Sequence, residues 1–243
     1  MRAPRFHVPE LPGDEALALP DGAARHVARV LRLRPGATIE LFDGDGHAQL
    51  AELIEVTPRR ARARRLRALP DEPPAELPAH LLLGLSKGER MDFAIQKAVE
   101  LGVTRITPTR TARSVVRLNT ERLARRQRHW HGVLVAACEQ SGRNRLPQLD
   151  PVLPFAHALS EARGAPRLLL DPRAGQRFSA LREPRPEELA FLVGPEGGLA
   201  EDEIERAVGE HCFIAVRLGT RVLRTETAPL ALLAAAQTLW GDF

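Results

Sequence analysis

The chain has 243 residues, 44% of them hydrophobic, which is enough to bury a core without disulfide staples. Cys138 and Cys212 stand far apart with no CxxC or Cys/His spacing, so the cysteines indicate neither a disulfide framework nor a zinc site and suggest a cytoplasmic protein. No run approaches the roughly 20 apolar residues of a membrane span, and no apolar segment follows Met1 as in a signal peptide.

The formal net charge is +4, and 33 of the 35 basic residues are arginine. Arginine binds phosphate bidentately and stacks on bases, which favours an RNA partner. A GC-rich genome would produce the same excess of arginine. The number of arginines therefore does not indicate RNA binding, and only their clustering in the sequence can.

The first 69 residues or so read as a small β-rich unit. Strands are predicted at 5–8, 38–42 and 48–56, the last two flanking the hairpin signal D-G-D-G at 43–46, and a short helix is predicted over 23–33. The segment 58–69 alternates arginine and alanine, which predicts a strand with Arg60, Arg62 and Arg64 on one face.

Two acid-free arginine clusters lie in this unit. They consist of Arg25, Arg29, Arg32 and Arg34, and of Arg59, Arg60, Arg62, Arg64, Arg65 and Arg67. Scattered surface arginines are the ordinary alternative, but this concentration favours a nucleic-acid face. The candidate RNA-binding residues are Arg25, Arg29, Arg32, Arg60, Arg62, Arg64 and, further along the chain, Arg113. Since no aromatic residues are interleaved with the clusters, we expect contacts to phosphates.

The proline-rich stretch 70–78 reads as a linker, because prolines fit neither a helix interior nor a central strand. We therefore predict two domains, 1–72 and 73–243. Beyond the linker, buried strands alternate with helices, beginning with a strand at 80–85. Ser86 and Glu89 are spaced as a capping box for a helix that ends at Gly102, with Met91, Ala94, Ile95, Ala98 and Val99 as its apolar stripe.

A strand at 105–109 leads into a loop with three arginines, Arg110, Arg113 and Arg117, and then into a long helix capped by Asn119 or Thr120. Its inward positions are Leu123, Trp130, Val133, Leu134, Ala137 and Cys138. His129 and His131 are two residues apart and point to different faces, so we predict no metal site. The helix ends in E-Q-S-G-R at 139–143, either a polar helix end or a face toward a substrate.

Three more strands follow, at 167–170, 189–193 and 213–218, and an apolar helix over 228–240 that must be covered by the sheet or by a second subunit. G-P-E-G-G at 194–198 follows one strand, and the hydroxyl-rich R-T-E-T at 224–227 precedes the last helix, which its side chains are expected to cap. The pattern predicts a five-stranded α/β domain with ligand loops at the carboxyl ends of its late strands.

These two loops, together with K-G-E-R-M at 87–91, Q-K-A-V-E-L-G at 96–102, R-S-V-V at 113–116 and E-Q-S-G-R, resemble the motifs of the SPOUT methyltransferases, in particular the bacterial 16S ribosomal RNA uridine N3-methyltransferases. The resemblance covers essentially the whole chain. It implies a PUA-like β-barrel followed by a SPOUT domain with a C-terminal trefoil knot, a homodimer, and S-adenosylmethionine as methyl donor to 16S rRNA of the 30S subunit.

The resemblance also implies the site residues. Cofactor-binding residues would be Leu170, Gly194, Pro195, Glu196, Gly197, Leu218, Gly219, Leu223, Arg224, Thr225 and Thr227. Uridine N3 must lose a proton, so Glu139 is a candidate base, and Arg143 and Arg224 are candidates to stabilise the negative charge on the uracil. Each of these three residues has an equally good structural role as a helix end or loop anchor.

Other functions remain open at this point. A SPOUT enzyme could act on another rRNA or tRNA nucleotide, or the chain could bind the ribosome without chemistry. A nucleotide hydrolase is disfavoured because no G-x-x-x-x-G-K-[ST] is present, and a Rossmann enzyme is disfavoured because no G-x-G-x-x-G follows an early strand.

Overall fold

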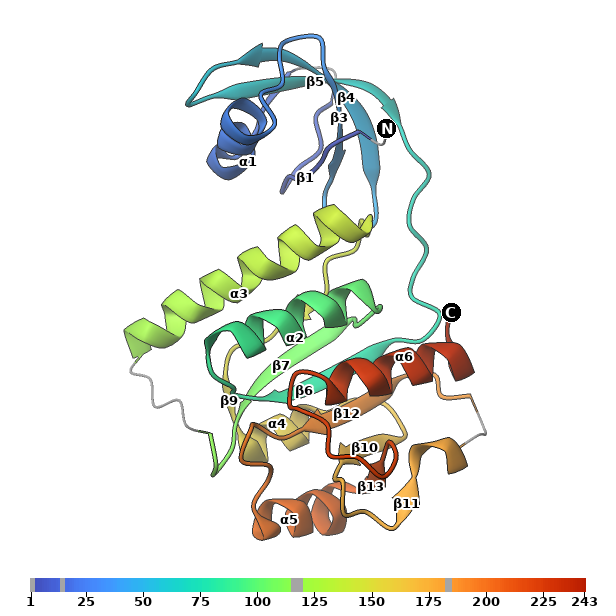
Figure 1. The fold of residues 1–243 in the computed structure, drawn as a ribbon. Helices are drawn as coiled ribbons and strands as arrows, with labels where there is room; N and C mark the ends of the chain where they lie inside the picture. Colours follow the sequence, from blue (N-terminus) through green and yellow to red (C-terminus); the bar gives the residue numbers. More distant parts are fainter. Residues whose placement is uncertain (1–2, 14–15, 115–119, 182–184) are drawn as a thin grey trace. The chain divides into compact units, whose positions relative to one another are not determined.

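The computed structural model describes residues 3–13, 16–114, 120–181 and 185–243. The chain divides into two compact units (Figure 1). The first comprises Met1–Pro74 and Cys138–Leu146, and the second comprises Ala75–Ala137 and Pro147–Phe243. The predicted division into 1–72 and 73–243 assigns residues 138–146 to the second domain, whereas they belong to the first compact unit. Among the described helices, none is long and apolar enough to cross a membrane.

The first unit is built on a five-stranded sheet. Its strands, in spatial order, are β1 (Arg5–His7), β3 (Thr38–Phe42), β4 (Ala48–Val56), β5 (Ala61–Ala68) and β2 (Leu17–Ala18). β1 runs parallel to β3 and the other pairs are antiparallel. Phe42 pairs with Ala48 across D-G-D-G, which confirms the predicted hairpin.

One helical segment closes the core of this unit. The predicted helix over 23–33 is in fact α1 (Asp21–Arg25) followed by the π-helical turn η1 (His26–Val30), and it ends before Arg32, whose φ is 54°. That left-handed conformation stops a helix. The core consists of Phe6, Val8, Leu19, Ala24, Val27, Ile39, Leu41, Ala51, Leu53, Ala61 and Ala63. Alternating residues of β5 thus face inward, as the arginine–alanine pattern predicted.

Most arginines of the two predicted clusters are exposed. Arg25, Arg29 and Arg32 are exposed, as is Arg64, whereas Arg62 is half-buried. The prediction for Arg60 was wrong in one respect, since β5 begins only at Ala61. Arg60 lies in a turn in which its carbonyl accepts a hydrogen bond from the N–H of Thr57, at 2.7 Å, so it does not share a strand face with Arg62 and Arg64.

The second unit contains an all-parallel sheet. Its strands, in spatial order, are β11 (Gln176–Arg177), β13 (Phe213–Arg217), β10 (Arg167–Leu170), β12 (Leu189–Val193), β6 (Ala79–Gly84), β7 (Arg105–Arg110) and β8 (Gln148–Leu149), with β9 (Leu153–Pro154) also paired to β7. The five longer strands are those predicted. The expectation of five strands was incomplete because β8, β9 and β11 have two residues each, too few to show a periodic pattern.

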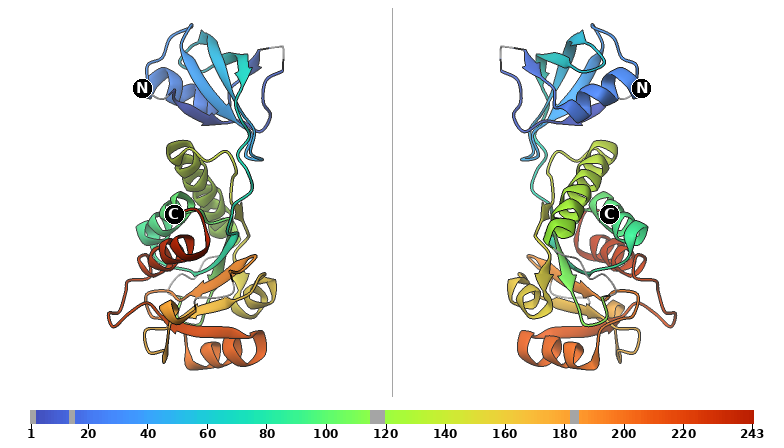
Figure 2. Two further views of the ribbon diagram at one scale, coloured as in Figure 1. Left: turned by 90° about the vertical axis from the view of Figure 1, so that its right-hand side faces the viewer. Right: turned by 90° about the vertical axis from the view of Figure 1, so that its left-hand side faces the viewer.

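Helices cover both faces of this sheet (Figures 1 and 2). α4 (Phe155–Glu161) and α5 (Glu201–His211) share one apolar cluster with the strands, and α2 (Gly88–Glu100) lies beside α6 (Ala228–Trp240) on the other face. The bounds of α6 and the buried stripe of α2 are as predicted. A short 3-10 turn, η2, spans Phe178–Ala180.

Helix α3 (Thr120–Ser141) buries Trp130, Leu134, Ala137 and Cys138, in agreement with the predicted inward face. The last residues of α3, from Cys138 to Ser141, belong to the first compact unit. The proposed cap Asn119, the loop residue Arg117 and the last two positions of R-S-V-V lie outside the described residues, as does the side chain of Thr120.

The capping box predicted for α2 was wrong. Ser86 is buried, and its hydroxyl donates to the carbonyl of Gly84 at 3.2 Å. The N-cap is instead Lys87, and no side chain of the same segment caps the helix. The backbone N–H of Lys87 donates to the carboxylate of Glu196, 3.0 Å away, so a residue 109 positions later supplies the acceptor that sequence spacing assigned to Glu89.

A buried polar network joins β6, β7 and β8. His80 is fully buried, and its Nε2 lies 2.7 Å from the hydroxyl of Thr107, which donates in turn to the carboxylate of Asp150. Arg105 donates to the same carboxylate at 2.8 Å. Burial, and then the cation of Arg105, lower the pKa of His80 to about 4, so its imidazole is neutral in the folded protein at physiological pH.

This histidine makes stability depend on pH. Between pH 6.5 and 4 the unfolded chain binds a proton on His80 that the folded chain does not, so stability is complete above pH 6.5 and falls as the pH drops toward 4. We expect urea unfolding to show a loss of about 2 kcal/mol between pH 7.5 and pH 5 from this group. His80→Gln, which does not titrate, should remove that share; an unchanged pH dependence in the variant would contradict the assignment.

Candidate active site

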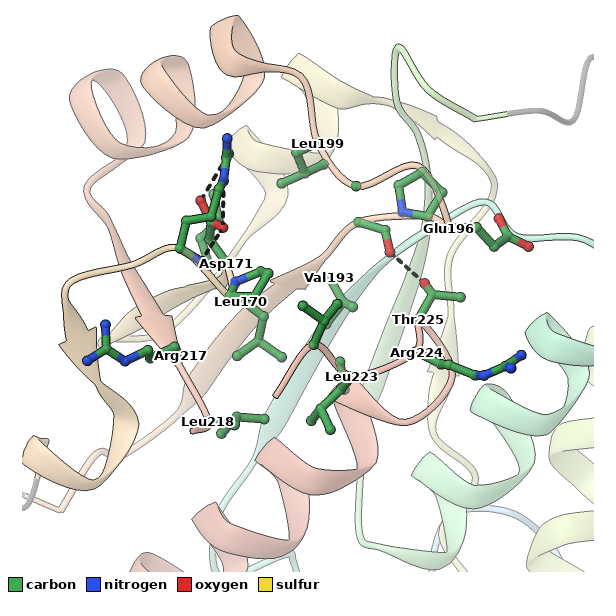
Figure 3. Close-up of a pocket in the computed structure, with 18 of the residues that line it drawn as sticks. Leu170, Asp171, Val193, Glu196, Leu199, Arg217, Leu218, Leu223, Arg224 and Thr225 are labelled. Atoms are coloured by element: carbon green, nitrogen blue, oxygen red, sulfur yellow. Dashed lines mark hydrogen bonds and ion pairs between the residues drawn. The ribbon is translucent and has the colours of Figure 1, made fainter. Parts of the chain in front are cut away.

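A cavity of about 590 Å³ opens at the carboxyl ends of β10, β12 and β13, which are adjacent in the sheet (Figure 3). Its walls come from the stretches 169–173, 193–199, 216–219 and 221–226, and from Arg90, Arg113, Ile204 and Ala228. Parallel α/β sheets bind ligands at this edge, because the loops that leave adjacent strands meet there. The cavity has the size of a small-molecule site.

Apolar side chains line the interior of the cavity. Figure 3 shows Leu170, Val193, Leu218 and Leu223 around its centre, with Leu199 farther out. All the predicted cofactor residues line it except Thr227, which is exposed and forms the N-cap of α6. The arrangement can hold a flat apolar ring between leucines while backbone groups of the glycine loop meet its polar edge.

The glycine loop 194–198 is held against the end of β6. A Cβ on Gly84 would lie 2.6 Å from the backbone nitrogen of Pro195 and 2.9 Å from the carbonyl carbon of Gly194, so only glycine lets the loop approach. The hydroxyl of Thr225 donates to the carbonyl of Gly194 at 2.6 Å. This bond ties the loop after β12 to the loop after β13, and the two predicted ligand loops form one structure.

The expected side-chain cap of α6 is absent. Neither Thr225 nor Thr227 caps the helix through its hydroxyl; the backbone N–H of Thr227 donates to the carbonyl of Arg224 at 2.9 Å. Pro229 occupies the first turn of the helix, a position that proline tolerates. Thr225 is drawn away from the helix by its bond to Gly194, a contact that spans 31 residues and has no local sequence signal.

Glu196 anchors the loop through its side chain. Its carboxylate accepts from the N–H of Lys87 at 3.0 Å and from Nη1 of Arg90 at 3.2 Å. Partial burial opposes ionisation, but these hydrogen bonds hold the pKa of Glu196 below its ordinary value. Glu196 therefore remains charged at the start of α2, where the helix dipole favours an anion.

Charged groups surround the mouth of the cavity. Arg224 extends to the same side as Glu196 in Figure 3 and is exposed. On the other side, Arg173 bridges Asp171, at 3.2 Å, and Glu201, at 2.6 Å. Arg90, Arg113, Arg217 and Arg221 also line the cavity. The opening thus combines arginines that are paired with carboxylates, such as Arg90 and Arg173, with the exposed Arg113 and Arg224.

The other two predicted catalytic residues, Glu139 and Arg143, belong to the first unit and do not line the cavity. Glu139 accepts a hydrogen bond from the backbone N–H of His7 at 3.1 Å. Burial raises its pKa, against the opposing effect of that bond. Arg5, held by Glu40, donates to the carbonyl of Arg143 at 3.0 Å and to Asn144 at 2.6 Å. The E-Q-S-G-R segment is therefore fastened to the β-rich unit.

The described ranges contain no group of three or more His, Cys, Asp or Glu residues that could hold a metal ion. Nε2 of His129 lies 2.7 Å from Asp92 on the surface. Gly84 and Asp171 were not among the predicted site residues, and Arg90 was quoted only as part of the K-G-E-R-M motif. Gly84 ends an apolar strand, and glycine at that position is a signal for close backbone approach that could have been used.

The chain combines a β-rich unit that has exposed arginines with a parallel α/β unit whose glycine-loop cavity lies at the carboxyl ends of its strands, and the family models identify this class of protein as an RNA methyltransferase. Residues 73–237 match the family described as an RNA methyltransferase domain, and residues 19–64 match the RNA methyltransferase PUA domain. The matched regions fall in both units of the structure.

Similar proteins narrow the class. A ribosomal RNA small subunit methyltransferase E from Mycobacterium bovis is 36% identical over 98% of this chain and 93% of its own length. The crystal structure of a ribosomal RNA small subunit methyltransferase E from Neisseria gonorrhoeae bound to S-adenosyl methionine is 42% identical, covers 100% of both chains and has a TM-score of 0.90. A putative methyltransferase from Legionella pneumophila, in complex with the same cofactor, is 34% identical over 100% of both chains with a TM-score of 0.93. The chain belongs to the ribosomal RNA small subunit methyltransferase E family.

Proposed function

We propose that this protein transfers the methyl group of S-adenosylmethionine to N3 of one uridine in the 16S rRNA of the small ribosomal subunit. The observation that carries the proposal is the cavity at the carboxyl ends of adjacent strands, whose glycine loop 194–198 packs on Gly84 and is bonded to Thr225. Its volume, leucine walls and close backbone approach fit an adenosine. Relatives that match the full chain were crystallised with this cofactor.

The protein's contribution to the reaction is positioning and charge stabilisation. S-adenosylmethionine supplies a methyl group that its sulfonium already activates. Leu170, Leu218 and Leu223 would hold the adenine, and Arg224 at the cavity mouth would stabilise negative charge on the uracil oxygens as N3 loses its proton. Arg143 and Glu139 remain candidates for the substrate side, Glu139 as a base whose raised pKa suits proton removal.

RNA would be held through phosphate contacts by arginines of the first unit, the exposed Arg25, Arg29, Arg32, Arg60 and Arg64 and the half-buried Arg62. We further propose the domain limits 1–72 and 73–243, the second a SPOUT domain. Its C-terminal trefoil knot is supported by the path of the chain after β13, which crosses the cavity before α6 packs beside α2. The assembled 30S subunit is the proposed partner, in the cytoplasm.

We also propose a homodimer. Phe93 on α2 and Leu239 on α6 are each 46% exposed on two helices that lie side by side, and a second subunit would cover them. Sedimentation velocity should give twice the monomer mass of 26.8 kDa.

The function is tested by transfer of labelled methyl from S-adenosylmethionine to unmodified 16S rRNA, offered free and as assembled 30S subunits, with the product mapped by mass spectrometry. We expect methyl on N3 of one uridine, preferentially in the subunit. Methyl on another nucleotide, including one in tRNA, would overturn the substrate while retaining the enzyme class. No transfer and no cofactor binding would leave a ribosome-binding protein without chemistry.

A further inference from the structure

Arg113 belongs both to the predicted RNA-binding set and to the wall of the cofactor cavity. It is exposed and follows the end of β7. Its Nη1 donates to the carbonyl of Gly197 at 3.0 Å, which makes it the side chain that holds the second half of the glycine loop.

The turn that carries Arg113 is well fixed. The buried carboxylate of Glu203 accepts from the N–H of Ala112 at 2.8 Å and, through its other oxygen, from the N–H of Ala200 at 2.9 Å. Thr111 and Ser114 close the turn with a backbone bond of 3.1 Å and a bond between their hydroxyls of 3.0 Å. The carboxylate of Glu203 thus links the backbone next to Arg113 to the backbone that follows the glycine loop.

Arg113 also packs on Gly197. A Cβ built on Gly197 would lie 3.2 Å from the Cβ of Arg113 and 3.6 Å from its Cδ. The arginine stem therefore covers the face of the glycine, and a shift of the guanidinium would move the peptide that lines the cavity. A hydrogen bond and a packing contact therefore both connect the side chain of Arg113 to the glycine loop.

The charge of Arg113 has no carboxylate partner among the residues that the structure describes. Within the described part of the chain its guanidinium forms no ion pair, and Gly197 is its hydrogen-bond acceptor. A guanidinium has five N–H donors in a planar fork, so the bond to Gly197 leaves several for the oxygens of a phosphate. Exposure at the cavity mouth puts these donors where RNA would pass.

We propose that Arg113 couples the two binding events: a backbone phosphate of the RNA and the carbonyl of Gly197 share its guanidinium, so RNA and cofactor each strengthen binding of the other. The inference rests on the proposed function. A phosphate that fixes the guanidinium also restricts the motion of the glycine loop. The cofactor then binds a loop that is already ordered, and less conformational entropy is lost on binding. By thermodynamic linkage the gain is the same in both directions.

The test measures the affinity of S-adenosylhomocysteine, which cannot transfer a methyl group, by calorimetry with and without saturating 16S rRNA. We expect RNA to raise the affinity of the unchanged protein about tenfold. In Arg113→Met this ratio should fall to near one, and in Arg113→Lys, which keeps the charge without the fork, it should lie between. Arg206→Met, an exposed arginine on α5 outside the cavity, should retain the full ratio.

Equal ratios in the unchanged protein and in Arg113→Met, or no effect of RNA on the unchanged protein, would overturn the coupling. The first unit supplies most of the proposed RNA contacts, so both variants should still bind RNA at the concentrations used. Failure of the unchanged protein to bind S-adenosylhomocysteine at all would instead overturn the proposed function, which keeps the two outcomes distinct.

Discussion

Gly84→Ala is expected to weaken binding of S-adenosylmethionine about 10- to 100-fold, the equivalent of the roughly 1–3 kcal/mol that overpacking costs. The new methyl group would meet backbone atoms of Gly194 and Pro195 at 2.6 to 2.9 Å. These atoms cannot rotate away as a flexible side chain can, so the loop itself must retreat from β6. Retreat would strain the bond from Thr225 and displace the peptides that face the cofactor.

Calorimetric titration of the cofactor into Gly84→Ala measures this effect, and circular dichroism with thermal unfolding checks that the fold survives. Gly132→Ala is the matched control, because a Cβ on Gly132 meets no atom within 4 Å and the position is helical. The control should bind the cofactor normally and gain slightly in stability. Wild-type affinity in Gly84→Ala would show that the loop does not need its present distance from β6.

Arg224→Ala is expected to lower kcat by about 100-fold, the scale on which loss of one charge-stabilising donor acts. Arg224 lines the cavity and is exposed toward its mouth, where a base would enter. Under the proposed function Arg224 stabilises charge that develops on the uracil, so cofactor affinity should change only a few-fold. Single-turnover transfer to 30S subunits at saturating cofactor and RNA is the measurement.

Arg224→Lys should recover part of the rate because the charge remains while the planar fork is lost. Arg206→Ala removes an exposed arginine that does not line the cavity and should leave kcat unchanged. Arg143→Ala provides the comparison between the two candidates: a large fall in kcat there, with full turnover in Arg224→Ala, would move the charge-stabilising role to the E-Q-S-G-R segment.

Local pattern was sufficient for most of the secondary structure. Strands such as 189–193, the buried stripe of α2 and both ends of α6 follow from periodicity and from glycine or proline at their limits, because these features depend on residues a few positions apart. The two cofactor loops were predicted for the same reason. The class of ligand came from the resemblance of those loops to the motifs of the SPOUT methyltransferases.

The two capping predictions that were wrong depended on partners far away in the sequence. Ser86 has the spacing of a cap, yet the acceptor at the start of α2 is Glu196. Thr225 has the chemistry of a cap and bonds to Gly194 instead. In both cases two possible partners compete for one polar group, and only the packed fold decides between a neighbour and a residue tens of positions away.

The sequence by itself therefore determined the elements, the α/β class of the second unit and the residue types of the cavity, since short-range sterics and hydrophobic periodicity act within each segment. Only the tertiary structure decided that Gly84 faces the glycine loop, that Arg113 holds Gly197, and that Cys138–Leu146 joins the first unit. These are contacts between segments separated by roughly 60 to 140 positions, and they arise from how strands order in a sheet, which no local pattern encodes.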